Sequence, residues 1–278
     1  MQVRYYENVS SFNTDVFDIL TENEIQNNLP IDLITGRKLG NAEGFLLATV
    51  RGNDGVALTA IYVKPFHLLL YETGNRRNDD AVRLFARELL RTGAVPAGVM
   101  AESTLARRFA NEYRPAGDYR LHMSVAGMRL DKPVKYKNAP GFCRSLEARD
   151  LFFAPYWERA FSEDCRTTVF TITENSERLK TRLNKGTHYI WEDGTPVSQA
   201  VHGRDTPNGA LINGVYTPPL FRGRGYASSV VATLSNALLE RGKLFCCLLA
   251  EADNPSSYGM YRKLGYYDVC KLEDIRFE

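Results

Sequence analysis

Residues 213–228 read NGVYTPPLFRGRGYAS, and they join a β-prone segment to a helix through a glycine turn. Two prolines end the strand, because proline cannot donate to a β-ladder. Gly223 and Gly225 then lead into a helix that we expect over about 226–241. The first N–H groups of that helix have no partner within it, and the helix dipole is positive at this end. The segment therefore predicts a phosphate-binding site.

Two other interpretations fit parts of this turn. Arg222 and Arg224 add local positive charge to a phosphate site, but they also fit a tight turn with two solvated arginines. The spacing G-x-G-x-x-S is similar to a dinucleotide fingerprint, and Glu251 and Asp253 end the next strand, where a ribose-binding acid could lie. The context disfavours a dinucleotide fold, because too few elements follow and the third glycine is missing.

Composition limits the classes of protein that fit. The chain has 278 residues, 44% hydrophobic and 24% charged, which is ordinary for a globular protein of two domains or one large one. The net charge of +2 gives no overall attraction to nucleic acid or membrane. Apolar runs fall well short of the roughly 20 residues of a membrane helix, and residues 1–10 lack the apolar core of a secretory signal. We expect a cytoplasmic protein.

The cysteines argue against a metal or redox site. Their count of five is odd, and no C-x-x-C spacing occurs. Cys246 and Cys247 lie inside the apolar run 244–250, where small thiols commonly pack in the core. We therefore expect reduced cysteines and no metal.

The second half of the chain has a clear order of elements. Phe153, Trp157 and Phe161 recur at helical spacing over about 151–162. The remaining expected elements are a strand at 142–148, a helix at 174–183 capped by Thr173 and ended by Gly186, strands at 188–192, 197–202 and 211–217, the helix at 226–241, a strand at 244–250, a short helix from Asn254 to Gly265 and one or two strands over 266–277.

The first half contains a weaker version of the same order. Its expected elements are helices at 14–27, 81–90 and 105–113 and strands at 45–50, 56–63 and 68–71. Both halves therefore run strand, strand, strand, helix, strand, helix, strand, which predicts a divergent internal repeat. Residues 131–140 are polar and contain two prolines, which is typical of a linker. The predicted class is α+β, with two domains that each have a mixed, mostly antiparallel sheet flanked by helices.

Three motifs now resemble a known family. Arg222-x-x-Gly225-x-Ala227 is similar to the pyrophosphate loop of the GNAT superfamily of acyl-CoA-dependent N-acyltransferases. The strand around Val215 resembles the acyl-CoA-binding strand of that family, and residues 254–266 (NPSSYGMYRKLGY) resemble its downstream segment. The resemblance implies a catalytic GNAT domain at 141–278 after a linker at 131–140. It also implies a degenerate GNAT-like domain at 1–130, where residues 75–78 provide arginines but no glycine pair, in a tandem-GNAT layout.

The resemblance implies an acetyl-CoA site between two splayed strands. Pantetheine would lie beside the first strand, and an N–H near Val215 or Tyr216 would hold the acyl carbonyl oxygen. Asn254 would reach the pantetheine arm. The implied cofactor-binding residues are Val215, Tyr216, Thr217, Arg222, Gly223, Arg224, Gly225, Tyr226, Ala227, Ser228, Asn254, Ser257 and Tyr261.

The implied catalytic residues are less complete. Tyr261 occupies the family position whose hydroxyl protonates the leaving thiolate, although a core tyrosine is the alternative. The strand at 211–217 lacks the glutamate that many members use as a base. Glu251, Asp253 and His202 remain candidates at the ends of neighbouring strands, and Glu251 is our choice.

The expected function is transfer of acetyl from acetyl-CoA to a primary amine by direct attack. The acceptor is a small molecule or a peptide, and the sequence does not identify it. A CoA-binding sensor or scaffold without turnover is the alternative, because the strand glutamate is missing. Nucleic-acid binding is not expected, since no basic stripe alternates with aromatics. The oligomeric state is not predicted.

Overall fold

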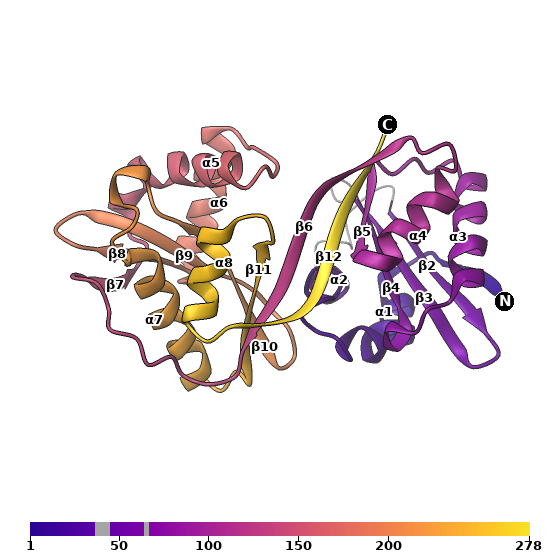
Figure 1. The fold of residues 1–278 in the computed structure, drawn as a ribbon, viewed down its shortest axis with the longest axis horizontal. Helices are drawn as coiled ribbons and strands as arrows, with labels where there is room; N and C mark the ends of the chain where they lie inside the picture. The colour runs from indigo at the N-terminus through magenta and orange to yellow at the C-terminus, as the bar shows by residue number, and fades with distance from the viewer. Residues whose placement is uncertain (37–44, 64–66) are drawn as a thin grey trace. The chain divides into compact units, whose positions relative to one another are not determined.

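The computed structural model describes residues 1–36, 45–63 and 67–278, and it divides into two compact units (Figure 1). The first unit comprises residues 1–127, 250–253 and 268–278. The second comprises residues 128–249 and 254–267. Each unit is therefore built from more than one stretch of the chain. Across the described ranges, no helix combines the length and hydrophobicity needed to cross a membrane.

The first unit is a mostly antiparallel sheet with helices on both faces. Its strand order is β1-β2-β3-β4-β5-β12-β6, and the β4–β5 pair is parallel. Its elements are β1 (Gln2–Tyr6), α1 (Val9–Thr21), α2 (Asn28–Thr35), β2 (Leu46–Gly52), β3 (Gly55–Tyr62), β4 (Leu68–Glu72), α3 (Asp79–Arg91), β5 (Gly98–Glu102), α4 (Ser103–Tyr113), β6 (Tyr119–Leu130) and β12 (Tyr267–Phe277). β6 and β12 each begin or end within the second unit.

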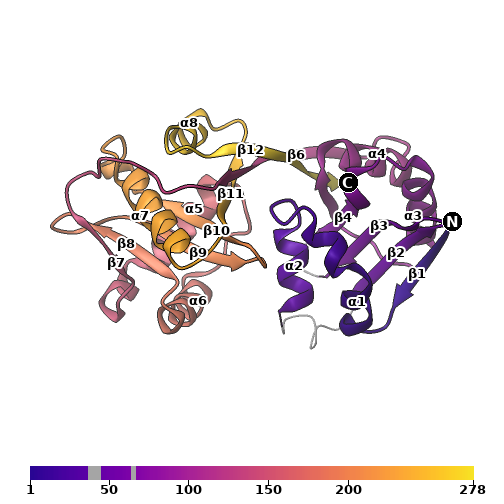
Figure 2. The ribbon, with the colours of Figure 1, turned by 90° about the horizontal axis from the view of Figure 1, so that it is seen from below.

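Alternate residues of the central strands supply two separate cores in this unit. On β4, Leu68 and Leu70 pack with α3 and α4, whereas Leu69 and Tyr71 pack with α1 and α2. Successive side chains of a strand point to opposite faces, so a strand buried on both faces reads as a continuous apolar run. Figure 2 shows the α1–α2 side of the sheet.

The second unit repeats this layout. Its strand order is β11-β10-β9-β8-β7, and β10 and β11 are parallel. Helix α7 packs on β8, β9 and β10, while α5 packs on α6 and β10. Its elements are β7 (Phe142–Ser145), α5 (Ala154–Asp164), α6 (Ile172–Lys185), β8 (His188–Glu192), β9 (Pro196–Asp205), β10 (Gly209–Tyr216), α7 (Tyr226–Glu240), β11 (Phe245–Glu251) and α8 (Pro255–Lys263).

The α+β class and the internal repeat are confirmed. The order β2-β3-β4-α3-β5-α4-β6 matches β8-β9-β10-α7-β11-α8-β12 element by element. The predicted order includes strands at the positions of β5 and β6, but the sequence pattern gives no bounds for these two strands. β1 was missed altogether. It is a mostly exposed edge strand that pairs with β2 alone, so it lacks the apolar alternation that marks a core strand.

The predicted cap of α6 was wrong. Thr171, not Thr173, is the N-cap residue, and its hydroxyl accepts from the N–H of Glu174 at 3.2 Å. The Glu174 carboxylate in turn accepts a hydrogen bond from the N–H of Thr171 at 2.8 Å. This reciprocal pair is a capping box, which starts the helix two residues earlier. The predicted end at Gly186 is confirmed, with the glycine in the left-handed conformation.

The last strand of the chain completes the sheet of the first unit. β12 pairs antiparallel with β5, from Leu272 opposite Glu102 to Arg276 opposite Gly98. Glu273 on β12 is fully buried, and it accepts two hydrogen bonds from Arg107 of α4, at 2.6 and 2.7 Å. A buried carboxylate needs such a partner. The C-terminal strand thus belongs to the hydrogen-bonded structure of the N-terminal half.

The expected thiol chemistry agrees with the structure. All five cysteines are free, and Cys246 and Cys247 on β11 are buried. Burial raises the pKa of Cys246 to about 12, so that its thiol is protonated at neutral pH. These two residues are packing residues of the second core.

Residues 131–140 form an extended segment that is fixed to α7 by side chains. Asn236 of α7 accepts from the N–H of Val134 at 2.7 Å and donates to its carbonyl at 3.1 Å. Ser229, one turn into the helix, accepts from the N–H of Ala139 at 2.8 Å and donates to the carbonyl of Gly225. The segment therefore covers the start of α7, and we call residues 134–139 the strap.

Replacing Asn236 should release the strap without unfolding the unit. In Asn236→Ala the amide of Val134 loses its acceptor, so its hydrogen exchange should become about tenfold faster. Alanine raises helix propensity by up to about 0.7 kcal/mol, which offsets part of the lost bonding. The melting temperature should therefore change little. Asn184→Ala, an exposed position on α6, is the matched control. Unchanged exchange at Val134 in Asn236→Ala would contradict the role of this side chain.

Candidate functional site

β10 and β11 pair over a short distance and then separate. Their parallel register covers Gly209, Ala210 and Leu211 opposite residues 245–247. β10 continues to Tyr216 and β11 continues to Glu251. Strands that continue without pairing present N–H and C=O groups to the space between them. An extended ligand can use those groups as an additional strand would.

A β-bulge lies on the part of β10 that pairs with β9 but not with β11. Asn213 pairs with Val201 and Tyr216 pairs with Gln199, so β10 advances three residues while β9 advances two. Gly214 takes up the extra residue, with φ at 59°. A positive φ is costly for residues other than glycine. The bulge redirects the N–H groups that follow Gly214 into the opening beside β10.

The glycine turn ends at a helix start with free donors. Gly223 and Gly225 have φ of 77° and 84°, and Gly225 is the N-cap of α7. A glycine cap has no side chain to accept from the helix. The N–H groups of Tyr226, Ala227 and Ser228 have no partner within α7, because they belong to its first turn. Together with the helix dipole they form an anion site.

The two arginines of the turn differ in their contacts. Arg222 donates from Nε to the carbonyl of Thr217 at 2.9 Å and pairs with Asp164 at 2.7 Å, which ties the end of β10 to the turn. This exposed ion pair contributes little stability. Arg224 is exposed beside the helix start, and the hydroxyl of Tyr226 donates to Asp193 at 2.6 Å.

The strap reaches the turn at Gly225. A Cβ built on this glycine would lie 3.3 Å from the hydroxyl oxygen of Tyr136 and 3.7 Å from the Cβ of Ala139. Together with the positive φ, this proximity makes any side chain at position 225 strained. A substitution there would combine backbone strain with added charge, so position 228 is the better place to test the anion site.

Helix α8 carries Tyr261, and Asn254 is its N-cap residue. The ring of Tyr261 is 8% exposed and packs edge-on against Tyr266, with centroids 6.0 Å apart. Burial raises the pKa of Tyr261, so its hydroxyl is protonated at neutral pH and is a weaker acid than that of an exposed tyrosine. Asn254 caps the helix by accepting from the N–H of Ser257 at 3.2 Å, which leaves its amide nitrogen to donate.

The sequence-based candidates for a base lie in different surroundings. His202 contacts Asp205 at 2.8 Å, and Asp205 also pairs with Lys243 at 3.0 Å. Glu251 and Asp253 lie in residues 250–253, the short segment that groups with the first unit. Glu251 stays a prediction.

Sequence reasoning missed an acidic side chain beside the bulge. Glu158 of α5 is 6% exposed, and its Oε1 lies 3.9 Å from the Cβ position of Gly214. A sequence signal was available. Glu158 follows the buried Ala154 by four residues, so the two share one face of the helix, and a charged residue at a buried helical position requires a partner.

The first unit contains a counterpart of this site with different chemistry. In the part of the chain that the structure describes, β4 and β5 also pair in parallel over a short distance, Leu68 with Val99 and Leu69 with Met100. At the start of α3, however, Asn78 caps the helix by accepting from the N–H of Ala81 at 3.0 Å. The first turn of α3 is thus already bonded to a side chain.

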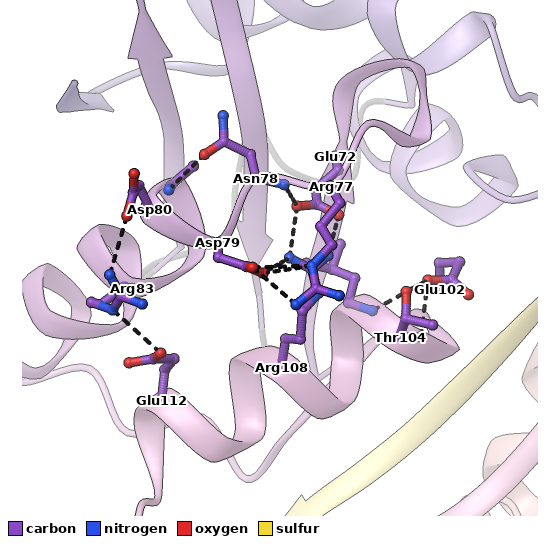
Figure 3. Close-up of polar contacts among 12 residues, drawn as sticks. Glu72, Arg77, Asn78, Asp79, Asp80, Arg83, Glu102, Thr104, Arg108 and Glu112 are labelled. Carbon is purple, nitrogen blue, oxygen red and sulfur yellow. Dashed lines mark hydrogen bonds and ion pairs between the residues drawn. The ribbon is translucent and has the colours of Figure 1, made fainter.

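Carboxylates surround this helix start, as Figure 3 shows. Glu72 accepts from the N–H of Asn78 at 2.7 Å and pairs with Arg108. Arg108 also contacts Asp79 at 2.9 Å, and Arg77 contacts the same carboxylate at 2.9 Å. Hydrogen bonds from Arg77 and then Arg108 lower the pKa of Asp79. Arg77 and Arg108 are thus paired with carboxylates at this helix start.

Comparison with known proteins agrees with this geometry. A family model described as FR47-like protein matches residues 193–274. An acetyltransferase of Yersinia pestis strain Pestoides F is 36% identical over 75 residues, which is 27% of this chain and 52% of that protein. An acetyltransferase of Pectobacterium atrosepticum is 37% identical over 78 residues, 28% of this chain and 54% of that protein. The chain spans about half the length of these curated relatives.

Solved structures match over the whole chain at low identity. A GNAT-family acetyltransferase from Colwellia psychrerythraea covers 100% of both chains at 11% identity, with a TM-score of 0.65. A GCN5-related N-acetyltransferase from Sphaerobacter thermophilus covers 99% of this chain and 95% of its own at 17% identity, with a TM-score of 0.67. A tandem GNAT protein from the clavulanic acid biosynthesis pathway covers 99% and 98% at 13% identity, with a TM-score of 0.58. These structural likenesses show that the chain has the tandem GNAT fold.

A negative charge at position 228 should prevent anion binding while leaving the fold intact. Ser228 lies in the first turn of α7, where a glutamate interacts favourably with the helix dipole. The same carboxylate competes with a phosphate for the free N–H groups. Ser228→Glu should therefore weaken acetyl-CoA binding by at least about tenfold in calorimetry without lowering the melting temperature. Ser228→Gln, of equal size, is the control. Equal affinities of the two variants would contradict the site.

Proposed function

We propose that this protein is an N-acyltransferase that moves an acetyl group from acetyl-CoA to a primary amine. The observation that carries the proposal is the separation of β10 from β11 past Leu211, next to a helix start with free donors at Gly225. This combination accommodates an extended amide chain and a pyrophosphate at the same time. The first unit has a similar strand separation but no free helix start.

The binding mode follows from the backbone groups available. Backbone groups of Val215 and Thr217 face the unpaired side of β10 and hydrogen-bond the pantetheine amides. Residues 223–228 hold the pyrophosphate through N–H groups, with Arg224 beside them. The side-chain amide of Asn254 and the hydroxyl of Ser257 contact the pantetheine arm from α8. These assignments follow the family motif residue by residue.

The reaction is a direct attack of the amine on the thioester carbonyl. The carbonyl oxygen gains negative charge in the transition state, and an N–H near Val215 or Tyr216, just past the bulge, stabilises that charge. Tyr261 occupies the family position for the hydroxyl that donates a proton to the departing thiolate. Glu251 at the end of β11 was the base favoured on sequence grounds.

Thiol release tests the function directly. The purified chain is incubated with acetyl-CoA and a panel of small amines, amino acids and peptides, and free thiol is followed with and without acceptor. Acceptor-dependent thiol release supports the transferase. Acetyl-CoA binding in calorimetry without release for any acceptor favours a CoA-binding sensor or scaffold. No acetyl-CoA binding at all would overturn both.

Acetyl-CoA should bind once per chain. The second unit provides glycine-backed donors at a helix start, whereas the corresponding place in the first unit is filled by Asn78 and by the carboxylates of Glu72 and Asp79. Calorimetry should therefore give a stoichiometry near one. A value near two would show that the first unit binds the ligand as well.

Removing the Tyr261 hydroxyl should slow turnover and leave binding unchanged. Tyr261→Phe keeps the ring and its contact with Tyr266, so the melting temperature and acetyl-CoA affinity should stay near those of the wild type. General acid catalysis contributes about 10²- to 10⁴-fold, and a thiolate is a good leaving group, so kcat should fall toward the lower end of that range. If Tyr261 has only a packing role, kcat per folded molecule will be unchanged when chemistry limits the rate.

A further inference from the structure

A buried polar cluster lies on the α5 side of β10, directly beneath the bulge. Oε1 of Glu158 accepts from Nε2 of Gln199 at 2.9 Å, and Oε2 accepts from Arg182 of α6 at 2.7 Å. The same Nε2 of Gln199 also donates to the carbonyl of Gly214 at 3.3 Å. Glu158 is thus connected through one amide group to the bulge residue itself.

His188 fixes the orientation of this cluster. It is fully buried, and burial lowers the pKa of His188 to about 4, so the ring is neutral at pH 7. Its Nε2 lies 3.2 Å from Oε1 of Gln199 and donates to it, because that oxygen can only accept. Among the residues the structure describes, Nδ1 of His188 has no hydrogen-bond partner. The ring therefore holds Gln199 with its donor group turned toward Glu158 and Gly214.

Glu158 lies next to the bulge at Gly214. Its Oε1 is 3.9 Å from the position a Cβ would occupy on Gly214, where Cγ2 of Val201 lies at 3.0 Å. The next residue, Val215, belongs to the strand that would carry the acyl carbonyl. Arg182 engages the other oxygen, so Oε1 is the oxygen on the bulge side. Trp157, the preceding residue of α5, has its ring 6.1 Å from that of Tyr216. Helix α5 thus brings a carboxylate and an aromatic wall to this part of β10.

We propose that Glu158 binds the acceptor amine and takes its proton during acetyl transfer. The inference rests on the proposed function and names the base for it. In the step, Oε1 of Glu158 first takes one proton from the bound ammonium and passes it to solvent. The neutral nitrogen then forms a bond to the thioester carbon, its second proton passes to Oε1, and the C–S bond breaks with its electron pair on sulfur. Tyr261 supplies the proton to that thiolate. The sum is one amide, one CoA thiol and one proton released to solvent, and the second proton on Glu158 returns through solvent to Tyr261.

The position of Glu158 explains how β10 can lack an acidic residue of its own. A carboxylate on α5 lies beside the same bulge from the neighbouring layer, with Oε1 3.9 Å from the Cβ position of Gly214. The acceptor class that fits is an amine that arrives protonated, since a buried carboxylate with one oxygen toward the site attracts an ammonium group.

Glu158→Gln tests the proposal, with Arg182→Gln as the matched control. Both variants break the same ion pair, but only the first removes the carboxylate. We expect Glu158→Gln to lower kcat by about 10²- to 10⁴-fold with acetyl-CoA affinity near that of the wild type, and Arg182→Gln to keep most of its turnover. Both should lower the melting temperature. Equal losses of kcat in the two variants, or none in Glu158→Gln, would overturn the proposal.

A second acceptor separates catalysis from structure. An amine of low pKa such as hydroxylamine is neutral at pH 7 and needs less help to lose a proton, so Glu158→Gln should lose much less activity with it than with an alkyl amine. A purely structural role predicts the same loss for both acceptors and would overturn the proposal. If Glu158→Gln does not fold, Glu158→Asp replaces it in the same comparison. Absence of thiol release by the wild type itself overturns the proposed function and this inference together, whereas release by an unimpaired Glu158→Gln overturns this inference alone.

Discussion

The site depends on hydrogen bonds that two parallel strands do not make. β10 and β11 pair at residues 209–211 and then separate, and the bulge at Gly214 turns the following backbone into the opening. Unpaired backbone groups are costly when they are buried without partners, so a strand edge of this kind is stable only if water or a ligand satisfies it. The free donors at Gly225 lie beyond the end of the same strand. Backbone groups along β10 and at the start of α7 are thus available to an extended ligand that carries an anion.

The two halves show how the same topology can keep or lose such a site. In both, a parallel pair separates beside a helix start. In the second half a glycine occupies the cap, and the donors stay available. In the first half Asn78 accepts from the N–H of Ala81, Glu72 accepts from the N–H of Asn78, and Arg108 pairs with Glu72 and Asp79. A few side chains at one turn thus decide between ligand binding and a structural role.

One buried polar cluster of the second unit lies next to the bulge. A carboxylate such as Glu158 is costly to bury, and Arg182 and Gln199 compensate it with direct hydrogen bonds. A neutral His188 completes the cluster. Apolar residues of equal volume would serve a purely structural core at no greater cost. Because this cluster lies next to Gly214, its carboxylate is close to the proposed reaction site.

Local sequence determined the elements whose signals are short in range. The glycine turn, the start of α7 at Tyr226, the end of α6 at Gly186 and the repeated order of strands and helices follow from turn chemistry and periodicity. The cap at Thr171 is also a local signal, but Thr173 lies closer to the predicted helix start and is the cap that the sequence pattern favours. Tertiary structure alone decided that β12 joins the first sheet and that Glu158 reaches Gly214. Strand pairing and contacts between layers join residues far apart in the chain, and periodicity shows which face is buried without showing what lies against it.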